Sequence, residues 1–309
     1  MKKLVAIVFV LSLILGLTAC SPKKSEKYVI AISQPFMGHP IRKAGQILID
    51  QWAAKHPDVQ VIVTDGQLNA QKQIADIEDL MAKKVSILLV AAHQSPTLVG
   101  VLREVTGADI PIIAFDRVLT DTSVQIGSVI NDEFNGGKQC AEIMIEAIGS
   151  GDIAVLEGPA GNTGALLRGN GFMAGIEGTG VKVIVSQVAN FQRVQAVDAF
   201  ENILQANPNI KAVWAQNDEM ALGVVQVLQA ANRTDILVIG YDGQKDALEA
   251  IIAGKMYGTV RKIIEFPASL DMALEYLQTG KIKEPNIFLP PLKVTKKNVN
   301  DVYDVNAVF

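Results

Sequence analysis

Short apolar runs rich in β-branched residues alternate with amphipathic segments from residue 28 to residue 253, and this alternation constrains the fold most. The runs are almost continuously apolar, as in Ile110–Asp116 and Ile236–Asp242. Such runs are typical of strands that a parallel sheet buries on both faces, and the segments between them have helical length and period. The sequence therefore predicts an α/β fold with doubly wound parallel sheets.

The expected elements form two successive groups, as the length suggests for two domains. The first group has strands at 28–33, 59–65, 85–91, 110–116 and 124–129, with helices at 40–55, 70–83 and 96–106. The second has strands at 152–157, 181–188, 210–216 and 236–242, with helices at 133–148, 164–178, 192–206, 219–231 and 245–253. A strand at 256–260, a helix at 266–278 and an extended segment at 283–291 belong to neither group by pattern alone. Residues 292–309 predict a short strand and a partly ordered end.

The first 27 residues have a different character. Lys2 and Lys3 precede an apolar run at 4–17 and then small residues, which predicts a secretory signal peptide at 1–19. The run is too short for a comfortable membrane span. The cysteine at the cut resembles a bacterial lipobox, in which Cys20 carries lipid; an ordinary signal peptide with an accidental cysteine is the alternative. Residues 20–27 are polar and predict a flexible tether.

Charge, cysteine and histidine content argue against several kinds of partner and binding site. The whole sequence carries a net charge of −4, and loss of Lys2 and Lys3 with residues 1–19 changes it to −6. With no basic patch visible, we expect no nucleic-acid partner. Cys140 lies in an apolar helical pattern and predicts a buried structural thiol. The three histidines are scattered without metal-ligand spacing, so we expect no metal and no cofactor.

Polar residues gather where the expected strands end, which is where open parallel sheets bind ligands. The mixture of carboxylates, amides and guanidinium groups suits a ligand with many hydroxyls. Phe191, and Phe36 as a second candidate, predict cover for the C–H faces of a sugar ring. Each residue alone fits an ordinary helix cap or turn. The residues are Gln34, Asp65, His93, Asp116, Arg117, 158–163, Asn190, Phe191, Asn217, Asp218 and Asp242, with Arg168 and Arg193 just beyond.

The sequence lacks the usual motifs of catalytic sites. The chain contains no Gly-x-Ser-x-Gly and no P-loop motif, and Gly169 and Gly171 predict helix packing rather than a dinucleotide fingerprint. Asp116 and Asp242 are a carboxylate pair of the kind glycosidases use. However, we expect an arginine beside each to lower its pKa, which suits a hydrogen-bond acceptor better than a general acid. We therefore expect no enzyme.

Residues 215–223, Ala-Gln-Asn-Asp-Glu-Met-Ala-Leu-Gly, resemble the signature of ribose-type periplasmic binding proteins, the solute receptors of sugar ABC importers and relatives of the lactose-repressor core. Further matches lie at 110–117, 158–163, 168–172 and 238–243. The resemblance covers residues 28–295. It implies two lobes joined by a three-crossover hinge, with the ligand in the cleft between them. The implied lobes are 28–130 plus 263–290, and 131–262 plus 291–309.

The resemblance also implies ligand contacts, with departures from the ribose pattern. His39 replaces the family's asparagine before the first helix proline, and Ile41 and Arg42 replace two aromatic residues. Lys262, or Arg261 in another register, replaces a glutamine. Gln34, residues 65–67 and Arg42 look more like the galactofuranose-binding branch. The expected ligand site is Gln34, His39, Arg42, Asp116, Arg117, Arg168, Phe191, Asn217, Asp242 and Lys262.

The expected site has more cations than carboxylates. Four of them, Arg42, Arg117, Arg168 and Lys262, face only Asp116 and Asp242 unless Glu133 or Asp218 joins. Unpaired charges are costly in a desolvated cleft. This balance favours a ligand with an acidic or electron-rich group, such as a sugar acid, beside the neutral furanoses, pentoses and hexoses.

The resulting prediction is a monomeric solute-binding lipoprotein of an ABC sugar importer. It closes about its hinge on a monosaccharide and delivers the sugar to the permease and ATPase. Lipid at Cys20 holds it on the outer face of the cell membrane or on the periplasmic face. The alternative is a sensory sugar receptor that signals to a chemoreceptor or sensor kinase; the cleft does not separate the two, but a permease encoded nearby would. A repressor-type regulator needs a helix-turn-helix where the signal peptide stands.

Overall fold

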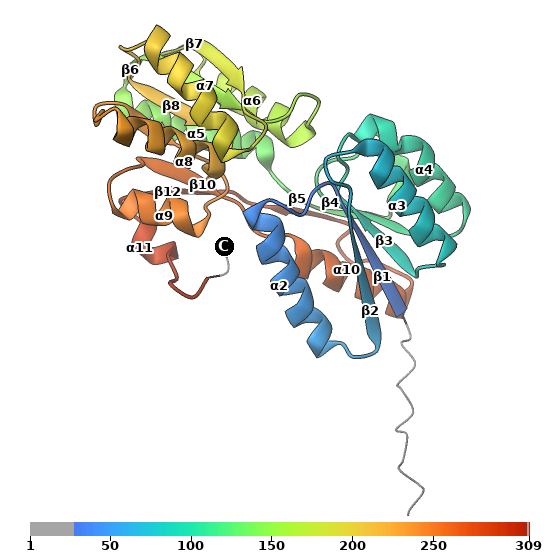
Figure 1. Cartoon of the computed structure of the whole chain (residues 1–309). Coiled ribbons are helices and arrows are strands. Elements are labelled where there is room, and N and C mark those ends of the chain that lie inside the picture. Colours follow the sequence, from blue (N-terminus) through green and yellow to red (C-terminus); the bar gives the residue numbers. More distant parts are fainter. Residues whose placement is uncertain (1–27, 308) are drawn as a thin grey trace, which may run out of the picture.

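The computed structural model describes residues 28–307 and 309, which form two α/β lobes side by side (Figure 1). The expected signal peptide, Cys20 and the tether lie outside these residues. Within the described part of the chain, no helix is long and apolar enough to cross a membrane.

A six-stranded parallel sheet forms the centre of the first lobe, in the order β11-β5-β4-β3-β1-β2. Its strands are β1 (Tyr28–Gln34), β2 (Val59–Asp65), β3 (Ile87–Val90), β4 (Ile112–Asp116), β5 (Gly127–Asn131) and β11 (Asn286–Leu289). The helices of this lobe are α2 (Pro40–Lys55), α3 (Ala70–Ala82), α4 (Ser95–Gly107) and α10 (Phe266–Thr279), with a 3-10 turn at Thr122–Val124.

Both faces of this sheet are covered, which explains the continuous apolar runs. Ile30 and Ile32 pack in one cluster with residues of α2 and α10. Ala31, between them in sequence, points to the opposite face and packs in a cluster with residues of α3 and α4. Successive side chains of one strand therefore enter two different cores.

The second lobe has a six-stranded sheet in the order β12-β10-β9-β8-β6-β7. Its strands are β6 (Ser150–Glu157), β7 (Gly180–Val188), β8 (Ala212–Ala215), β9 (Leu237–Ile239), β10 (Gly258–Arg261) and β12 (Leu292–Thr295). Its helices are α5 (Glu133–Ile148), α6 (Thr163–Ile176), α7 (Arg193–Ala206), α8 (Asp218–Ala230), α9 (Lys245–Ile252) and α11 (Val299–Val302).

The predicted doubly wound α/β architecture is confirmed in both lobes, with one addition. The edge strand β12 runs antiparallel to β10. Only Pro290 and Pro291 separate β11 from β12, so the chain passes from the first sheet to the second without a crossover helix. The late βα unit divides between the lobes, because β10 joins the second sheet while Phe266 and Leu270 of α10 enter the core of the first.

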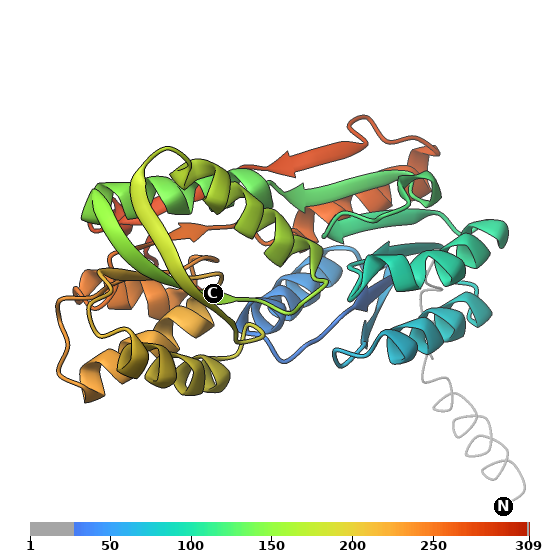
Figure 2. The same cartoon turned by 90° about the horizontal axis from the view of Figure 1, so that it is seen from above.

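Three segments cross between the lobes, after β5, β10 and β11 (Figure 2). Hydrogen bonds join these segments. The Asn131 side chain accepts from the Ile263 N–H at 3.1 Å and donates to the Ile263 carbonyl at 3.0 Å. It also donates to Glu265 at 2.5 Å. The Asp132 N–H donates to the Leu289 carbonyl at 3.2 Å. The hinge therefore consists of three backbone segments that hydrogen bonds hold together.

Helices α5 and α6 approach each other closely enough to require glycine. A Cβ atom at Gly137 would lie 2.1 Å from the Arg168 carbonyl oxygen, and one at Gly171 would lie 2.0 Å from the Phe134 carbonyl oxygen. Gly171 is thus a packing residue, as the sequence predicted. This close contact fixes α6, which carries Arg168, against the start of α5.

Candidate functional site between the lobes

A cavity of about 90 Å³ lies between the two lobes, where the carboxyl ends of the strands face each other. Its walls are formed by Pro35, Phe36, His39, Ile41, Arg42, Leu68, His93, Asp116, Arg117, Glu133, Pro159, Asn162, Gly164, Arg168, Asn190, Phe191, Gln192, Asn217, Asp242 and Lys262.

Strained backbone is concentrated around this cavity. Nine non-glycine residues of the described chain have positive φ, and five of them line the cavity. Non-glycine residues adopt this conformation at a cost, and it persists where the surrounding structure enforces it. The strain therefore marks the cleft as a built site. The five are Leu68, Asp116, Asn190, Phe191 and Asp242.

Asp116 is the centre of the first lobe's wall. It ends β4 and accepts hydrogen bonds from Arg42 and, at 2.7 Å, from the Lys262 ammonium. The Arg117 Nε atom lies 3.3 Å away. Burial alone would raise the pKa of Asp116, but Arg42, Lys262 and Arg117 together hold it well below its usual range. The carboxylate is therefore ionised and acts as an acceptor, as the sequence predicted.

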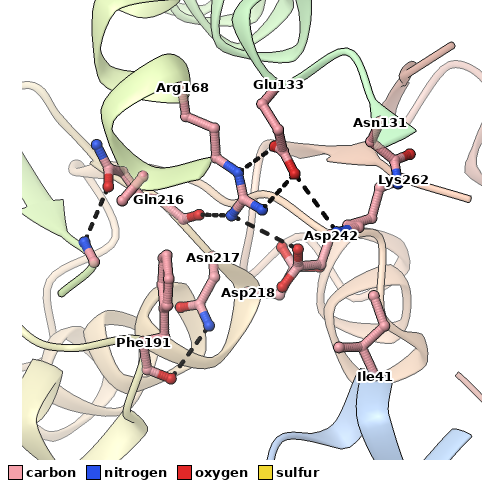
Figure 3. A network of polar contacts seen from close by, with 12 residues as sticks. Ile41, Asn131, Glu133, Arg168, Phe191, Gln216, Asn217, Asp218, Asp242 and Lys262 are labelled. Carbon is pink, nitrogen blue, oxygen red and sulfur yellow. Dashed lines mark hydrogen bonds and ion pairs between the residues drawn. The ribbon is translucent and has the colours of Figure 1, made fainter. Parts of the chain in front are cut away.

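Arg168 is the centre of the second lobe's wall (Figure 3). Its guanidinium donates to both oxygens of Glu133, at 2.5 and 3.1 Å, and to the Gln216 carbonyl at 2.7 Å. It also stacks over Tyr241, with 3.9 Å from Cζ to the ring centroid, and lies 5.5 Å from the centre of Phe191. These contacts hold the planar donor group in one orientation toward the cavity.

The expectation for Asp242 is wrong. Arg168 lies 3.8 Å from this carboxylate, but its short hydrogen bonds go to Glu133 and Gln216 instead. Burial is the largest effect on Asp242 and raises its pKa to about 7, against the lowering influence of Arg168 and Lys262. Asp242 is therefore poised to donate or to accept, depending on its proton.

The expected surplus of positive charge does not hold either. Glu133 pairs with Arg168, and its Oε1 lies 3.5 Å from the Lys262 ammonium. Glu265 lies 3.1 Å from the same ammonium. The four cations therefore face four carboxyl groups, because two acidic residues at the hinge complete the cluster, although Asp242, with its pKa of about 7, is only partly ionised at neutral pH. The expected surplus, and with it the premise for an acidic ligand, is much reduced.

The cavity brings together nine of the ten residues predicted for the ligand site. Gln34 is the exception: it is the last residue of β1, pairs with Asp65 of β2, and the chain reaches the cavity only at Pro35. Gln34 is fully buried and its amide has no hydrogen-bond partner. Lys262, rather than Arg261, faces the cavity.

Other strand-end residues divide into lining and structural roles. His93, Asn190 and Phe36 line the cavity. Asp65 and Asp218 do not: Asp65 accepts from the backbone N–H groups of Met37 and Gln67, and Asp218 accepts from those of Gly243 and Gln244. Arg193 turns away to pair with Glu219.

Two carboxylates of the charged cluster were not among the predicted site residues. Glu133 was considered only as a possible partner of the cations. It is the first residue of α5, directly after the N-cap Asp132, and its position two residues beyond β5 is the sequence signal that marks it. Glu265 follows the crossover after β10, which no strand-end pattern marked. No cluster of histidine, cysteine, aspartate or glutamate in the described ranges fits a metal ion.

Two apolar groups cover opposite sides of the polar cluster. Phe191 projects from the loop before α7, and Ile41 projects from the first turn of α2 in the other lobe (Figure 3). The Phe191 ring lies directly over Gly158, where a Cβ atom would lie 2.2 Å from Cζ. Polar groups around the edge and apolar groups above and below match the hydroxyls and C–H faces of a sugar ring.

The fold and the site define a two-lobed solute-binding protein with its ligand cleft at the hinge. A family model described as "Periplasmic binding protein domain" matches residues 30–281, so the chain belongs to the periplasmic binding protein family. Within it, the chain is of the ribose type, as its motifs predicted. This is a family of binding proteins and not of enzymes.

The ribose import binding protein RbsB of Bacillus subtilis is 33% identical over 96% of this chain and 100% of its own length. A D-apiose import binding protein of Actinobacillus succinogenes is 31% identical over 86% of this chain and 87% of its length. A solved ABC transporter solute-binding protein of Bacillus halodurans with bound myo-inositol superposes with a TM-score of 0.85 at 27% identity, covering 91% and 99% of the two chains.

Proposed function

We propose that the chain is the extracytoplasmic solute-binding lipoprotein of an ABC sugar importer, and that it binds one neutral monosaccharide or related polyol in the cleft. The observation that carries the proposal is the cavity itself. It has a balanced set of donors and acceptors from both lobes, and it has apolar cover from Phe191 and Ile41.

Balanced charge favours a neutral ligand. Arg42, Asp116 and Lys262 already satisfy one another, so a hydroxyl can exchange hydrogen bonds with them without leaving an unpaired ion behind. The ligands for which its relatives are named, which include ribose, D-apiose, xylitol and myo-inositol, are neutral polyhydroxylated compounds. Contacts from both lobes are complete only when the lobes are closed, so binding shifts the population toward the closed form.

Thermal melting of the purified protein across pentoses, hexoses, furanoses, polyols and sugar acids tests the proposal. A specific ligand stabilises the folded state by mass action, so one neutral sugar or polyol should raise Tm by several degrees at millimolar concentration. A hit confined to sugar acids would contradict the neutral-ligand part. The absence of any hit would contradict the sugar-receptor function.

The site residues and the anchor belong to the same proposal. Within the predicted set, the nine cavity-lining residues contact the sugar, and Cys20 carries the lipid that holds a monomeric receptor near its permease. Metabolic labelling with palmitate checks the anchor. Wild type should be labelled and membrane-associated, and a Cys20→Ala variant should be neither.

A further inference from the structure

His39 and Asn217 make a direct hydrogen bond from one lobe to the other. His39 caps the start of α2 in the first lobe, and Asn217 caps the start of α8 in the second. The Nδ2 atom of Asn217 lies 3.0 Å from the Nε2 atom of His39. This contact joins the two walls of the cleft through their own side chains.

The orientation of Asn217 determines which histidine tautomer fits. Its Oδ1 atom accepts from the Met220 N–H at 2.9 Å, and Nδ2 also donates to the Phe191 carbonyl at 3.2 Å. The amide nitrogen therefore faces His39, and Nε2 of the imidazole must accept. A neutral imidazole has one acceptor nitrogen, and two donors face the ring: Asn217 at Nε2, at 3.0 Å, and the Ile41 N–H at Nδ1, at 3.4 Å. The shorter contact takes the acceptor, so the proton belongs on Nδ1, and the Ile41 N–H loses Nδ1 as its cap.

Charged groups from four elements face this imidazole. Arg42 of α2, Arg168 of α6 and Lys262 after β10 oppose a positive ring, while Glu219 of α8 favours one. Burial is the largest effect, and with Arg42 it lowers the pKa of His39 from 6.5 to about 3. The neutral ring is thus the form that fits between the closed lobes.

We propose that His39 is a positioning residue for lobe closure, a latch whose neutral imidazole accepts from Asn217 and whose protonation releases the lobes. A protonated ring presents N–H at Nε2 to the N–H of Asn217, so two donors face each other. The proposed function makes His39 and Asn217 sugar contacts. The latch goes beyond it, since it describes their contact with each other in the cleft without sugar and does not depend on which sugar binds.

The sign of the pH effect follows from the two states. When the lobes separate, the ring regains solvent and its pKa returns toward 6.5. A charged His39 must therefore lose its proton when the lobes close. The equilibrium constant for closing consequently falls as pH drops below about 6.5. Between pH 7.5 and pH 5 the closing constant falls by up to about 30-fold.

Nitrogen-15 NMR of the histidine rings tests the latch on the protein without added sugar, so it is independent of the proposed function. The His39 signals are assigned by their loss in a His39→Gln variant. Wild type should show the Nδ1–H tautomer at pH 7.5 and a titration midpoint well below 6.5. An Asn217→Asp variant keeps a cap on α8 and should raise the midpoint by at least about one pH unit, because the carboxylate attracts the charged ring. The Nε2–H tautomer, or equal midpoints in the two proteins, would overturn the proposal.

Small-angle X-ray scattering tests the conformational consequence. The radius of gyration of wild type should increase between pH 7.5 and pH 5. His39→Gln keeps an acceptor that does not titrate and should abolish the change. His56→Gln is the matched control, because His56 lies at the other end of α2, stacked on Trp52, and should expand like wild type. Equal expansion of His39→Gln and wild type, or no expansion of wild type, would contradict the latch.

Discussion

The ammonium of Lys262 lies 2.7 Å from Oδ1 of Asp116, and both side chains are buried. Lys262 directly follows β10 of the second lobe, and Asp116 ends β4 of the first. The pair therefore ties the two sheets together at the hinge. The same ammonium also faces Glu133 and Glu265, so one cation compensates three carboxylates.

Replacing Lys262 by methionine should destabilise the protein strongly. Three buried carboxylates would lose their shared cation, and loss of one partner from a buried ionic cluster costs about 3–5 kcal/mol. Lys262→Gln retains an N–H donor and should cost less. Urea unfolding gives both values. Lys297→Gln, which removes an exposed pair with Glu146, is the control and should leave the free energy of unfolding nearly unchanged. A Lys262→Met protein as stable as this control would refute the hinge role.

An Arg168→Lys substitution should weaken sugar binding roughly 10- to 100-fold. Lysine cannot reproduce the forked contact with Glu133 together with the bond to the Gln216 carbonyl, so the donors lose their orientation. Calorimetric titration with the sugar that gives the largest melting shift measures the loss. Arg193→Lys, at a half-exposed pair with Glu219, should bind like wild type. Equal affinities of the two variants would contradict the role of Arg168.

Asp242→Asn should stabilise the protein without sugar at pH 8 while weakening sugar binding. The pKa of Asp242 is raised from 3.8 to about 7, mainly by burial, so its ionisation costs stability as pH rises between those values. The variant's advantage over wild type should therefore grow by about 3 kcal/mol from pH 5 to pH 8. Thermal unfolding at both pH values measures it.

Asp235→Asn is the control for this pH experiment. Its carboxylate is exposed, and hydrogen bonding, first of all to Arg233, lowers its pKa to about 2. No stability gain at pH 8 is expected from it. If Asp242→Asn behaves in the same way, Asp242 is not a destabilising buried charge in the folded protein.

Gly158→Ala should weaken binding roughly tenfold with little change in unfolding free energy. The new Cβ atom would meet the far end of the Phe191 ring at 2.2 Å, and that ring would turn away from the cavity. Sugar titration and urea unfolding together separate the two effects. Gly100→Ala on α4, where a Cβ atom meets nothing within 4 Å, should leave binding unchanged. Unaltered affinity of Gly158→Ala would show that the Phe191 ring position is unimportant.

Much of the site was accessible to sequence reasoning because parallel sheets bring strand ends to one edge. Asp116, Phe191, Asn217 and Asp242 each follow a strand and all line the cavity. Gln34 ends β1 as Asp116 ends β4, but the Gln34 side chain is fully buried and does not line the cavity. A place at a strand end therefore does not by itself decide whether a side chain enters the cleft.

Electrostatic partners were less accessible. An arginine near Asp242 suggested a lowered pKa, but the guanidinium of Arg168 is committed to Glu133, and burial raises the pKa instead. The neutralising role of Glu265 depends on the path of a crossover segment. Such pairings depend on distances of a few ångströms between residues far apart in the chain, which residue patterns do not encode.

The sequence by itself determined the α/β class and the order of its elements, because strands buried on two faces need continuous apolar runs and helices need their own period and caps. It also determined the family, through residues 215–223 and the other matching segments. Only the tertiary structure decided the charge balance of the cleft, the protonation of Asp242 and the contact from His39 to Asn217. All three depend on burial and on neighbouring side chains, and these side chains come together only when both lobes have folded and meet at the hinge.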